Sequence, residues 1–266
     1  MSPSINRFSS RKYLGQHFLA NNHIVARILD AAELSLDDCV VEIGPGRRVL
    51  TKRLVEQVKR VVAVELDSGL ARALPQRLDY PANFTCVEAD ARVVNIAELI
   101  VPDICYKVVA NLPYYAANLI LRRLLESQLK PNIVVVMVQQ EAGERIAASV
   151  GNPAYGAVSV RVALRGQASI VGQVPPSVFY PRPRVNSVVV AIERVEKNIE
   201  LKVENQVIEL LRIAFNQRRK MLRKSLKGHL REGTIERAHI SPTSRPEALD
   251  LGQWIALAQL SSLGEP

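Results

Sequence analysis

The stretch CVVEIGPG, residues 39–46, decides the fold. Its first five residues are typical of a buried strand, and two glycines follow at once. Glycine lets the backbone turn tightly and approach a ligand beneath the start of a helix. A dinucleotide fingerprint, G-x-G-x-x-G, needs a third glycine, but Val49 stands in its place. We therefore predict a strand, a turn and a helix with no pyrophosphate site; a plain turn without ligand is the alternative.

Strand-like and helical stretches alternate downstream, which favours a parallel sheet covered on both faces. A later pair of strand-like runs is joined by the proline-rich connector PPSVFYPRPRV, and a helical tail follows from about residue 204 to 264. We expect an α/β catalytic domain over residues 1–200 and a smaller all-helical domain over 201–266. The other predicted strands cover residues 60–66, 83–89, 107–111, 132–139, 167–174 and 186–195.

Polar residues and glycines stand where the first four predicted strands end. Ligands of open α/β sheets bind at this edge, and a carboxylate about 20 residues after the glycines can accept both hydroxyls of a ribose. Any one of these residues could instead be a cap or a solvated side chain. Together they predict an adenosine-containing ligand without a pyrophosphate, namely S-adenosylmethionine. The residues are Glu42, Gly44, Gly46, Glu65, Asp90 and Asn111.

The stretch NLPYY, residues 111–115, predicts a site that holds an adenine amine. The amide oxygen of Asn111 and the carbonyl of Leu112 could accept the two N–H bonds of the amine, and Pro113 restricts the direction of that carbonyl. Tyr114 could stack on a flipped base, and positioning would supply most of the help for an in-line methyl transfer. The alternative is an ordinary Asn-x-Pro turn. Tyr115 is expected to pack at the start of the next helix.

The chain is basic, with a formal net charge of +9 and a sequence pI of about 9.7. Residues 212–231 hold eight basic residues and no acidic one. We predict a single helix there, with Leu211, Phe215, Leu222 and Leu226 on its apolar face. Unbalanced charge favours phosphate binding over a solvated face. The predicted RNA-binding residues are Arg218, Arg219, Lys220, Arg223, Lys224 and Lys227, with Arg7, Arg11 and Lys12 as possible additions.

Composition is ordinary for a globular protein of 266 residues, 48% hydrophobic and 23% charged. No run approaches the roughly 20 apolar residues that span a bilayer, and residues 1–18 lack the apolar segment of a signal peptide, so we expect a cytoplasmic protein without membrane association. The three cysteines are expected in the core. The histidines show no metal-ligand spacing, and no metal is expected.

Seven motifs follow one another along the chain: GQHFL (15–19), EIGPG (42–46), VELD (64–67), EADA (88–91), NLPY (111–114), PPSVFYPRPRVNS (175–187) and FNQRRKMLRKSL (215–226). Together they resemble the ribosomal RNA adenine dimethyltransferases, the kasugamycin-sensitivity and dimethyladenosine transferase family. NLPY alone is also found in macrolide-resistance methylases of large-subunit RNA, whereas DNA adenine methylases more often have a second proline in place of Leu112. The NQRRK stretch and AYG (154–156) favour the small-subunit enzymes. The similarity runs from about residue 11 to 255.

The resemblance implies a Rossmann-like class I methyltransferase sheet, mostly parallel with one antiparallel strand. It implies an enzyme that uses S-adenosylmethionine to dimethylate the N6 amines of two adjacent adenines in the 3′-terminal hairpin of small-subunit rRNA, during ribosome biogenesis. The expected partner is the immature small subunit, and the expected state is a monomer. The resemblance also implies that Phe179 faces Tyr114 across the target base, and that the cofactor contacts His17, Leu19, Gly44, Gly46, Glu65, Asp90 and Asn111.

The chain departs from the family pattern at Arg47-Arg48-Val49, where many members have a glycine or small residue two places after Gly46. We expect both arginines to be exposed on the first helix turn, with cofactor binding intact. Positive charge beside a helix N-terminus is unfavourable, so a carboxylate or an RNA phosphate should offset it. Two other functions remain as hypotheses: an assembly factor that acts by binding the small subunit, and a mitochondrial transcription factor, which the lack of a transit-like leader disfavours.

Overall fold

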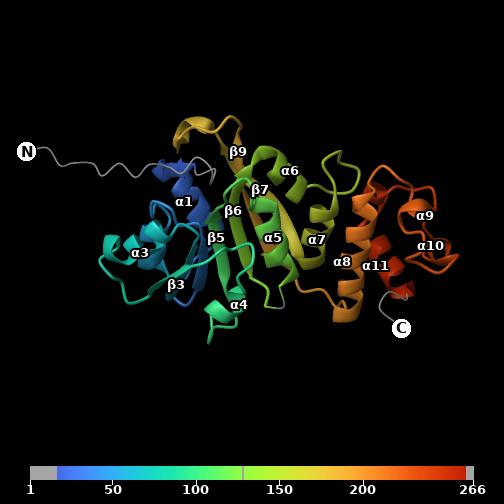
Figure 1. The fold of residues 1–266 in the computed structure, drawn as a ribbon, viewed down its shortest axis with the longest axis horizontal. Helices are drawn as coiled ribbons and strands as arrows, with labels where there is room; N and C mark the ends of the chain where they lie inside the picture. Colours follow the sequence, from blue (N-terminus) through green and yellow to red (C-terminus); the bar gives the residue numbers. More distant parts are fainter. Residues whose placement is uncertain (1–16, 128, 262–266) are drawn as a thin grey trace, which may run out of the picture. The chain divides into compact units, whose positions relative to one another are not determined.

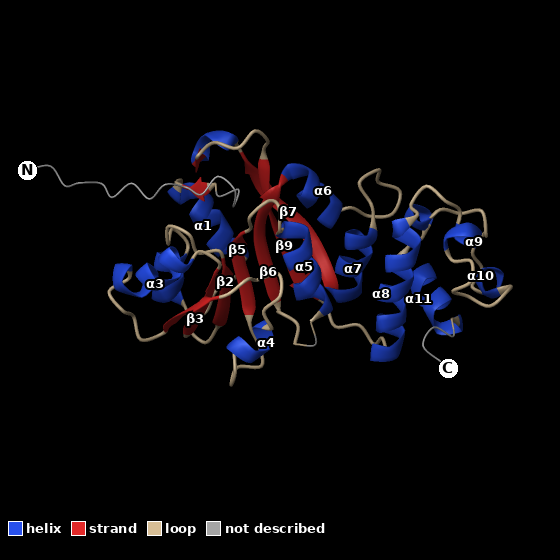
Figure 2. Cartoon of the chain, in the orientation of Figure 1, coloured by secondary structure: helices blue, strands red, loops and turns tan. Residues whose placement is uncertain are grey.

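A computed structural model describes residues 17–127 and 129–261. It contains a seven-stranded sheet with the strand order β4-β3-β2-β5-β6-β9-β7 (Figures 1 and 2). Each predicted strand is present, with ends that differ by at most one residue. The strands are β2 (Cys39–Ile43), β3 (Arg60–Glu65), β4 (Phe84–Glu88), β5 (Lys107–Asn111), β6 (Ile133–Gln139), β7 (Gly166–Val174) and β9 (Ser187–Arg194).

Strands β2 to β6 pair in parallel, so their carboxyl ends meet at one edge of the sheet. All five residues of β2 are buried, which is why its sequence is nearly continuous in apolar residues. The N–H of Gln140, just past the end of β6, donates to the carbonyl of Asn186, just before β9. β9 therefore runs antiparallel to β6, and the predicted mostly parallel sheet with one antiparallel strand is confirmed.

The connecting helices bury one apolar side each. In α5, residues Ile120, Leu121, Leu124 and Leu125 form the buried stripe. Asn21 caps α1 by accepting the N–H of Ile24, as expected for a side-chain oxygen at a helix start. The helices between the parallel strands and before them are α1 (Asn22–Ala31), α2 (Thr51–Gln57), α3 (Ser68–Arg77), α4 (Ile96–Leu99) and α5 (Ala117–Glu126).

A small antiparallel pair, β1 (Phe18–Leu19) with β8 (Phe179–Tyr180), joins the N-terminal segment to the proline-rich connector. Leu19 lies opposite Phe179, and both are buried in the core of the sheet unit. Phe18 lies opposite Tyr180, and because side chains alternate along a strand these two rings occupy the other face. A 3-10 turn, η2 (Pro176–Val178), precedes β8.

The chain divides into two compact units at places that differ from the predicted boundary at residue 200. The first holds the described residues up to Gln140 together with Val171–Ala191, and the second holds Glu141–Ile170 and the described residues from Ile192 on. The second unit packs its own core around the fully buried Trp254. Its remaining elements are α6 (Gln140–Ile146, which begins one residue before the division), α7 (Ala157–Arg165), α8 (Leu201–Asn216), α9 (Leu222–Ser225), α10 (Thr234–Arg237), η3 (Pro246–Ala248) and α11 (Leu251–Leu260).

The prediction of a single helix over residues 212–231 is wrong. Helix α8 ends at Asn216, a turn follows, and α9 begins at Leu222. The break redirects the chain so that the Leu222 N–H donates to the carbonyl of Ser244. Leu211, Leu222 and Leu226 are still buried in this unit, as the apolar pattern predicted, but they reach its core from two helices.

None of the described helices is long and apolar enough to cross a membrane. Over the same part of the chain, no three or more His, Cys, Asp or Glu side chains gather as a metal site would require. Cys39 is buried and Cys86 partly so, whereas Cys105 is exposed, and the prediction that it is a core residue is wrong.

Candidate active site

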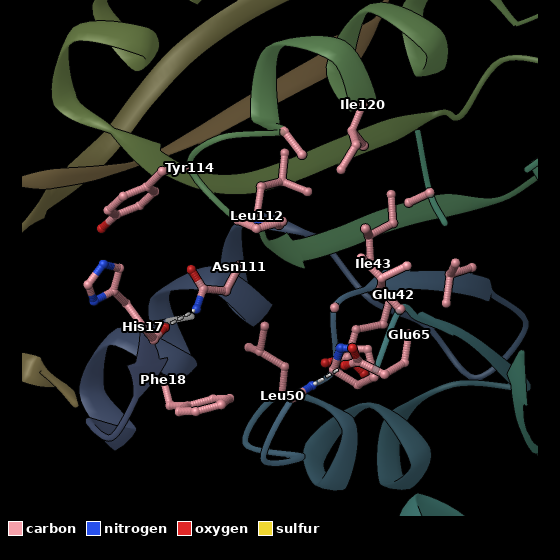
Figure 3. A pocket seen from close by; sticks show the side chains of 18 of the residues that line it. His17, Phe18, Glu42, Ile43, Leu50, Glu65, Asn111, Leu112, Tyr114 and Ile120 are labelled. Atoms are coloured by element: carbon pink, nitrogen blue, oxygen red, sulfur yellow. Dashed lines mark hydrogen bonds between the residues drawn. The ribbon is translucent and has the colours of Figure 1, made fainter. Parts of the chain in front are cut away.

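A pocket opens at the carboxyl edge of the parallel strands, inside the first unit (Figure 3). Its walls come from β1, the turns after β2, β3 and β4, the end of β5 and the start of α5. The structure thus brings together every residue predicted to contact a cofactor, along with the NLPYY stretch. The lining residues that the following paragraphs use are His17, Phe18, Leu19, Glu42, Gly44, Gly46, Arg47, Glu65, Asp90, Arg92, Asn111, Leu112, Pro113, Tyr114 and Tyr115.

The two glycines after β2 are required by the shape of the turn. Gly44 has φ +69° and Gly46 has φ +52°, a region that residues with a side chain rarely adopt. A Cβ on Gly46 would lie 3.1 Å from the ring of Phe18, which packs directly over it. The N–H of Gly46 donates to Glu65 Oε2 at 3.1 Å. The turn therefore presents backbone to the pocket and is tied to the end of β3.

Two carboxyl groups lie buried beneath this turn. Glu65 accepts N–H bonds from Gly46 and Asp67, which partly oppose the rise in its pKa that burial causes. Glu42 is 1% exposed, and burial raises its pKa to about 8, against an opposing effect of Thr51 and with a further rise from Glu65. No described residue hydrogen-bonds Glu42 Oε2. A buried oxygen without a partner at the wall of a pocket suits a cationic or N–H-bearing ligand.

Asp90, after β4, is held by Arg92. The guanidinium lies 2.6 Å from Oδ2 through Nη2 and 3.0 Å from Oδ1 through Nε, and the Arg92 N–H also donates to Oδ1 at 2.8 Å. These hydrogen bonds keep the pKa of Asp90 below its usual range. The Arg92 guanidinium also lies 5.6 Å from the centre of the Tyr115 ring. The sequence reasoning missed Arg92, although an arginine two residues after a strand-end aspartate is a usable signal.

Asn111 ends β5 with its amide in a fixed orientation. Its Nδ2 donates to the carbonyl of His17 at 3.0 Å, which leaves Oδ1 on the opposite side (Figure 3). The Leu112 N–H donates to the carbonyl of Met137, and the Pro113 carbonyl accepts from Ala116 and Ala117. No described residue donates to Asn111 Oδ1 or to the Leu112 carbonyl. Two acceptors without a donor among the described residues thus stand side by side in the chain at a strand end, where Leu112 is 1% exposed.

The two tyrosines of NLPYY differ in their surroundings. Tyr114 hydrogen-bonds Ser187 through its hydroxyl at 2.6 Å, and burial raises its pKa. The His17 ring lies 5.3 Å from the Tyr114 ring, tilted by 31°, and its Nδ1 donates to the carbonyl of Pro181 at 2.7 Å. Tyr115 is 52% exposed, so the expectation that it packs at the start of the next helix is wrong. Arg92 covers its ring instead.

Phe179 is not among the residues that line the pocket with Tyr114, contrary to the implication of the family resemblance. It is 5% exposed, packs in the core of the first unit and does not line the pocket. The register of β8 with β1 is the reason, because it directs Phe179 to the same side as the buried Leu19. The neighbouring Tyr180 is the exposed aromatic of the connector.

Arg47 and Arg48 are exposed, as expected, although they lie in the turn before α2 and outside its first turn. Arg47 Cζ lies 4.5 Å from the centre of the Phe18 ring and 5.9 Å from that of Tyr180. Within the described residues, neither arginine has an ion pair with a carboxylate. The expected compensating charge therefore does not come from this part of the chain.

With this geometry in place, comparison with known proteins decides the family. The profile of the family described as ribosomal RNA adenine dimethylase matches residues 7–261. The chain belongs to this family. Membership confirms the predicted enzyme class, an rRNA adenine methyltransferase, and S-adenosylmethionine as its methyl donor.

Curated relatives of this adenine dimethylase carry the name ribosomal RNA small subunit methyltransferase A. The protein of Clostridium perfringens (strain SM101 / Type A) is 40% identical over 258 residues, which are 95% of this chain and 90% of the relative. The protein of Dehalococcoides mccartyi (strain ATCC BAA-2266 / KCTC 15142 / 195) is 38% identical over 252 residues, 92% of this chain and 86% of the relative.

Two solved structures match the dimethylase over nearly their whole length. A dimethyladenosine transferase from Plasmodium falciparum aligns with a TM-score of 0.72 and 26% identity, covering 91% of this chain and 96% of that one. The 23S rRNA methyltransferase ErmE aligns with a TM-score of 0.70 and 23% identity, covering 92% and 99%. The second likeness shows the fold alone.

The residues of the dimethylase pocket fit its methyl donor. S-Adenosylmethionine carries an ammonium, a ribose and an adenine. The partnerless Oε2 of Glu42 can accept an ammonium N–H once this carboxyl is ionised, which a bound cation favours. Gly44 and Gly46 add no side chains of their own to the pocket. Glu65 and Asp90 place two further carboxyl groups along the same edge.

The residues predicted to bind RNA lie in the second unit of the dimethylase. All six are exposed, but Arg218 also donates to the carbonyls of Pro153 and Tyr155 at 3.3 and 3.4 Å, so it fastens the AYG turn. Arg219 and Lys220 lie in the turn after α8, and Arg223 and Lys224 lie on α9. Arg7, Arg11 and Lys12 lie outside the described residues.

Proposed function

We propose that this chain transfers methyl groups to the N6 amines of two adjacent adenines in the 3′-terminal hairpin of small-subunit rRNA, on the immature subunit. One observation carries the proposal: Asn111 Oδ1 and the Leu112 carbonyl are two acceptors without donors among the described residues, at the rim of a cofactor pocket. The names of the relatives at 38 and 40% identity support the small subunit as the substrate.

The two acceptors explain how an adenine amine becomes a nucleophile. Its lone pair is delocalised into the ring, so the free amine reacts poorly. When Asn111 Oδ1 and the Leu112 carbonyl accept its two N–H bonds, the nitrogen is held with its lone pair toward the methyl donor. The bond from Asn111 Nδ2 to the His17 carbonyl prevents the amide from turning over, so the oxygen stays available. Such preorganised positioning is the main contribution a protein makes to a displacement of this kind.

The bound cofactor supplies a methyl group on a sulfonium centre. We propose that Glu65 accepts the ribose hydroxyls through its remaining lone pairs, that Asp90 accepts from the adenine end, and that Glu42 faces the ammonium. The backbone at Gly44 and Gly46, with the other predicted contacts at His17, Leu19 and Asn111, completes the binding surface.

The target base is proposed to stack on Tyr114, whose ring is fixed by its bond to Ser187. Arg219, Lys220, Arg223, Lys224 and Lys227 are proposed to contact RNA phosphates, with Arg218 in a mixed structural and binding role. A phosphate contact is neutral to sequence and weakens with salt, so these residues set affinity and leave the choice of base to the pocket.

The test combines labelled S-adenosylmethionine with small subunits that lack the modification, followed by mass spectrometry of the RNA. The expected result is label on two adjacent adenines, each carrying two methyl groups. Asn111→Ala should lower the rate by roughly 100-fold or more, since one positioned acceptor is removed, with RNA affinity nearly unchanged. Asn118→Ala, an exposed asparagine on α5, is the matched control. Substantial activity in Asn111→Ala would refute the role of the amide.

A second function, assembly by binding alone, is favoured by one observation: the exposed cationic residues 219–227 lie in the unit that contributes nothing to the pocket. The same experiment separates the two. Tight binding of small subunits without any transfer of label would establish the assembly function and refute catalysis. Label on the RNA, lost in Asn111→Ala while binding persists, would establish the enzyme.

A further inference from the structure

The exposed side of the β1–β8 pair forms a surface that begins at the edge of the pocket and extends beyond it. Phe18 and Tyr180 lie opposite each other on this side, and Tyr180 is 67% exposed. The guanidinium of Arg47 lies over both rings. A guanidinium that stacks on aromatic faces keeps its in-plane N–H bonds free for an anion.

The two segments that meet at this surface are basic and contain no acidic residue. Residues 44–55 hold Arg47, Arg48, Lys52 and Arg53, and residues 175–192 hold Arg182 and Arg184. Among the described residues only Arg53 of these six has an ion pair, at 4.0 Å with Glu56. Concentrated charge of one sign is unfavourable in the free protein and is stabilised by a polyanion. We call Phe18, Arg47, Arg48, Tyr180, Arg182 and Arg184 the β1–β8 rim.

The rim is continuous with the pocket. Phe18 and Arg47 line it, and the carbonyl of Pro181, between Tyr180 and Arg182, accepts a hydrogen bond from His17. His17 in turn lies against Tyr114, the proposed stacking partner of the target base. A polymer whose base enters at Tyr114 therefore has its adjoining nucleotides at the rim.

We propose that the β1–β8 rim binds the RNA nucleotides adjacent to the target adenine, with the guanidinium groups on phosphates and Tyr180 stacked on an unpaired neighbouring base. The inference rests on the proposed methyl transfer to RNA. An adenine that leaves its stack exposes the faces of its neighbours. Exposed aromatic faces beside unpaired cations are the combination that binds single-stranded nucleic acid, since every base has a face to stack and every nucleotide a phosphate.

The test uses the full-length protein and small subunits that lack the modification. The double variant Arg182→Gln/Arg184→Gln should weaken binding and reduce the slope of log affinity against log salt by about two, because two phosphate contacts are lost. Tyr180→Leu should raise the KM for the subunit by about 5- to 30-fold with the salt slope unchanged, as expected for a lost stacking contact. Arg72→Gln, which removes one positive charge from α3, against two in the double variant, is the control and should leave both quantities unchanged.

Titration with S-adenosylhomocysteine supplies an independent readout. Affinity for this ligand should be unchanged in Tyr180→Leu and in the double arginine variant, which shows that the fold and the cofactor pocket are intact. Arg47→Gln should weaken RNA binding as well. Titration of this variant with S-adenosylhomocysteine measures separately any loss of affinity for the cofactor pocket.

The outcomes separate the rim from the proposed function. An unchanged salt slope in the double variant, or an unchanged KM in Tyr180→Leu, would overturn the rim while leaving methyl transfer intact. The wild-type protein could transfer no label and still bind RNA in a salt-dependent way that the double variant loses. In that case the proposed reaction fails and the rim stands as an RNA-binding surface.

Discussion

Replacing Glu42 by glutamine should change how stability depends on pH. Burial raises the pKa of Glu42 from its ordinary value of 4.5 to about 8, so at neutral pH the folded protein holds a proton there that the unfolded chain has lost. A group with a raised acidic pKa leaves stability intact below pH 4.5 and lowers it progressively as the pH rises toward 8. Glutamine has a similar shape but no titratable proton, so its contribution to stability does not depend on pH.

The magnitude follows from the two pKa values. Between them each pH unit costs about 1.4 kcal/mol for one proton. From pH 5 to pH 7 the wild-type protein should therefore lose about 2–3 kcal/mol relative to Glu42→Gln, after allowance for partial titration at pH 5. For a chain of this length that corresponds to a difference of roughly 5 °C in the midpoint of thermal unfolding.

Urea unfolding at pH 5, 6, 7 and 8 measures this difference. The gap in unfolding free energy between Glu42→Gln and wild type should widen with pH and level off above pH 8. Glu56→Gln, an exposed glutamate on α2, should show a gap that stays constant. Parallel curves for Glu42→Gln and wild type would refute the reasoning, because they would mean that Glu42 is ionised in the folded protein as readily as in the unfolded chain.

Two further predictions concern the same pocket. Gly46→Ala should destabilise the protein more than Gly44→Ala in urea unfolding. Both substitutions cost about 1–2 kcal/mol because alanine must adopt a positive φ, but only Gly46→Ala places a Cβ 3.1 Å from the Phe18 ring. Equal losses of unfolding free energy would contradict this prediction. Arg92→Leu should raise the pKa of Asp90 by removing its guanidinium partner. In calorimetric titration, S-adenosylhomocysteine binding should therefore weaken more at pH 5 than at pH 7.5. A loss of affinity that is independent of pH would refute the link between Arg92 and the ionisation of Asp90.

The sequence was sufficient to predict the sheet and the position of the pocket. Parallel strands buried on both faces require continuous apolar runs, and ligand-binding residues of such sheets stand just after those runs. Glu65, Asp90 and Asn111 could therefore be placed at one edge from their positions alone. The glycine turn was equally readable, since Gly44 and Gly46 adopt backbone angles that few other residues tolerate.

Other features depended on contacts that a single sequence does not contain. Which of Phe179 and Tyr180 is buried and which is exposed is set by a two-residue pairing with β1. The prolines of the connector hide the alternation of buried and exposed residues that a longer strand would show. The break after Asn216 was invisible to periodicity, because Leu211, Leu222 and Leu226 fit one helical stripe as well as they fit two helices. Tyr115 is 52% exposed, and the contact of its ring with Arg92 joins residues 23 apart in the sequence, which periodicity does not predict.

The division of the chain separates two roles that mutation can distinguish. The described pocket residues all come from the first unit, whereas the cationic residues 219–227 come from the second. Substitutions in the second unit should therefore change RNA affinity with no effect on cofactor titration. The β1–β8 rim shares Phe18 and Arg47 with the pocket, so substitutions of these two residues should affect both RNA binding and the cofactor pocket, whereas substitutions of Tyr180, Arg182 and Arg184 should affect RNA binding alone. If the rim and the second unit bind one RNA through independent contacts, the reductions in salt slope caused by substitutions in each must add when the substitutions are combined. A combined reduction equal to that of either set alone would mean that only one of the two surfaces contacts the RNA in the productive complex.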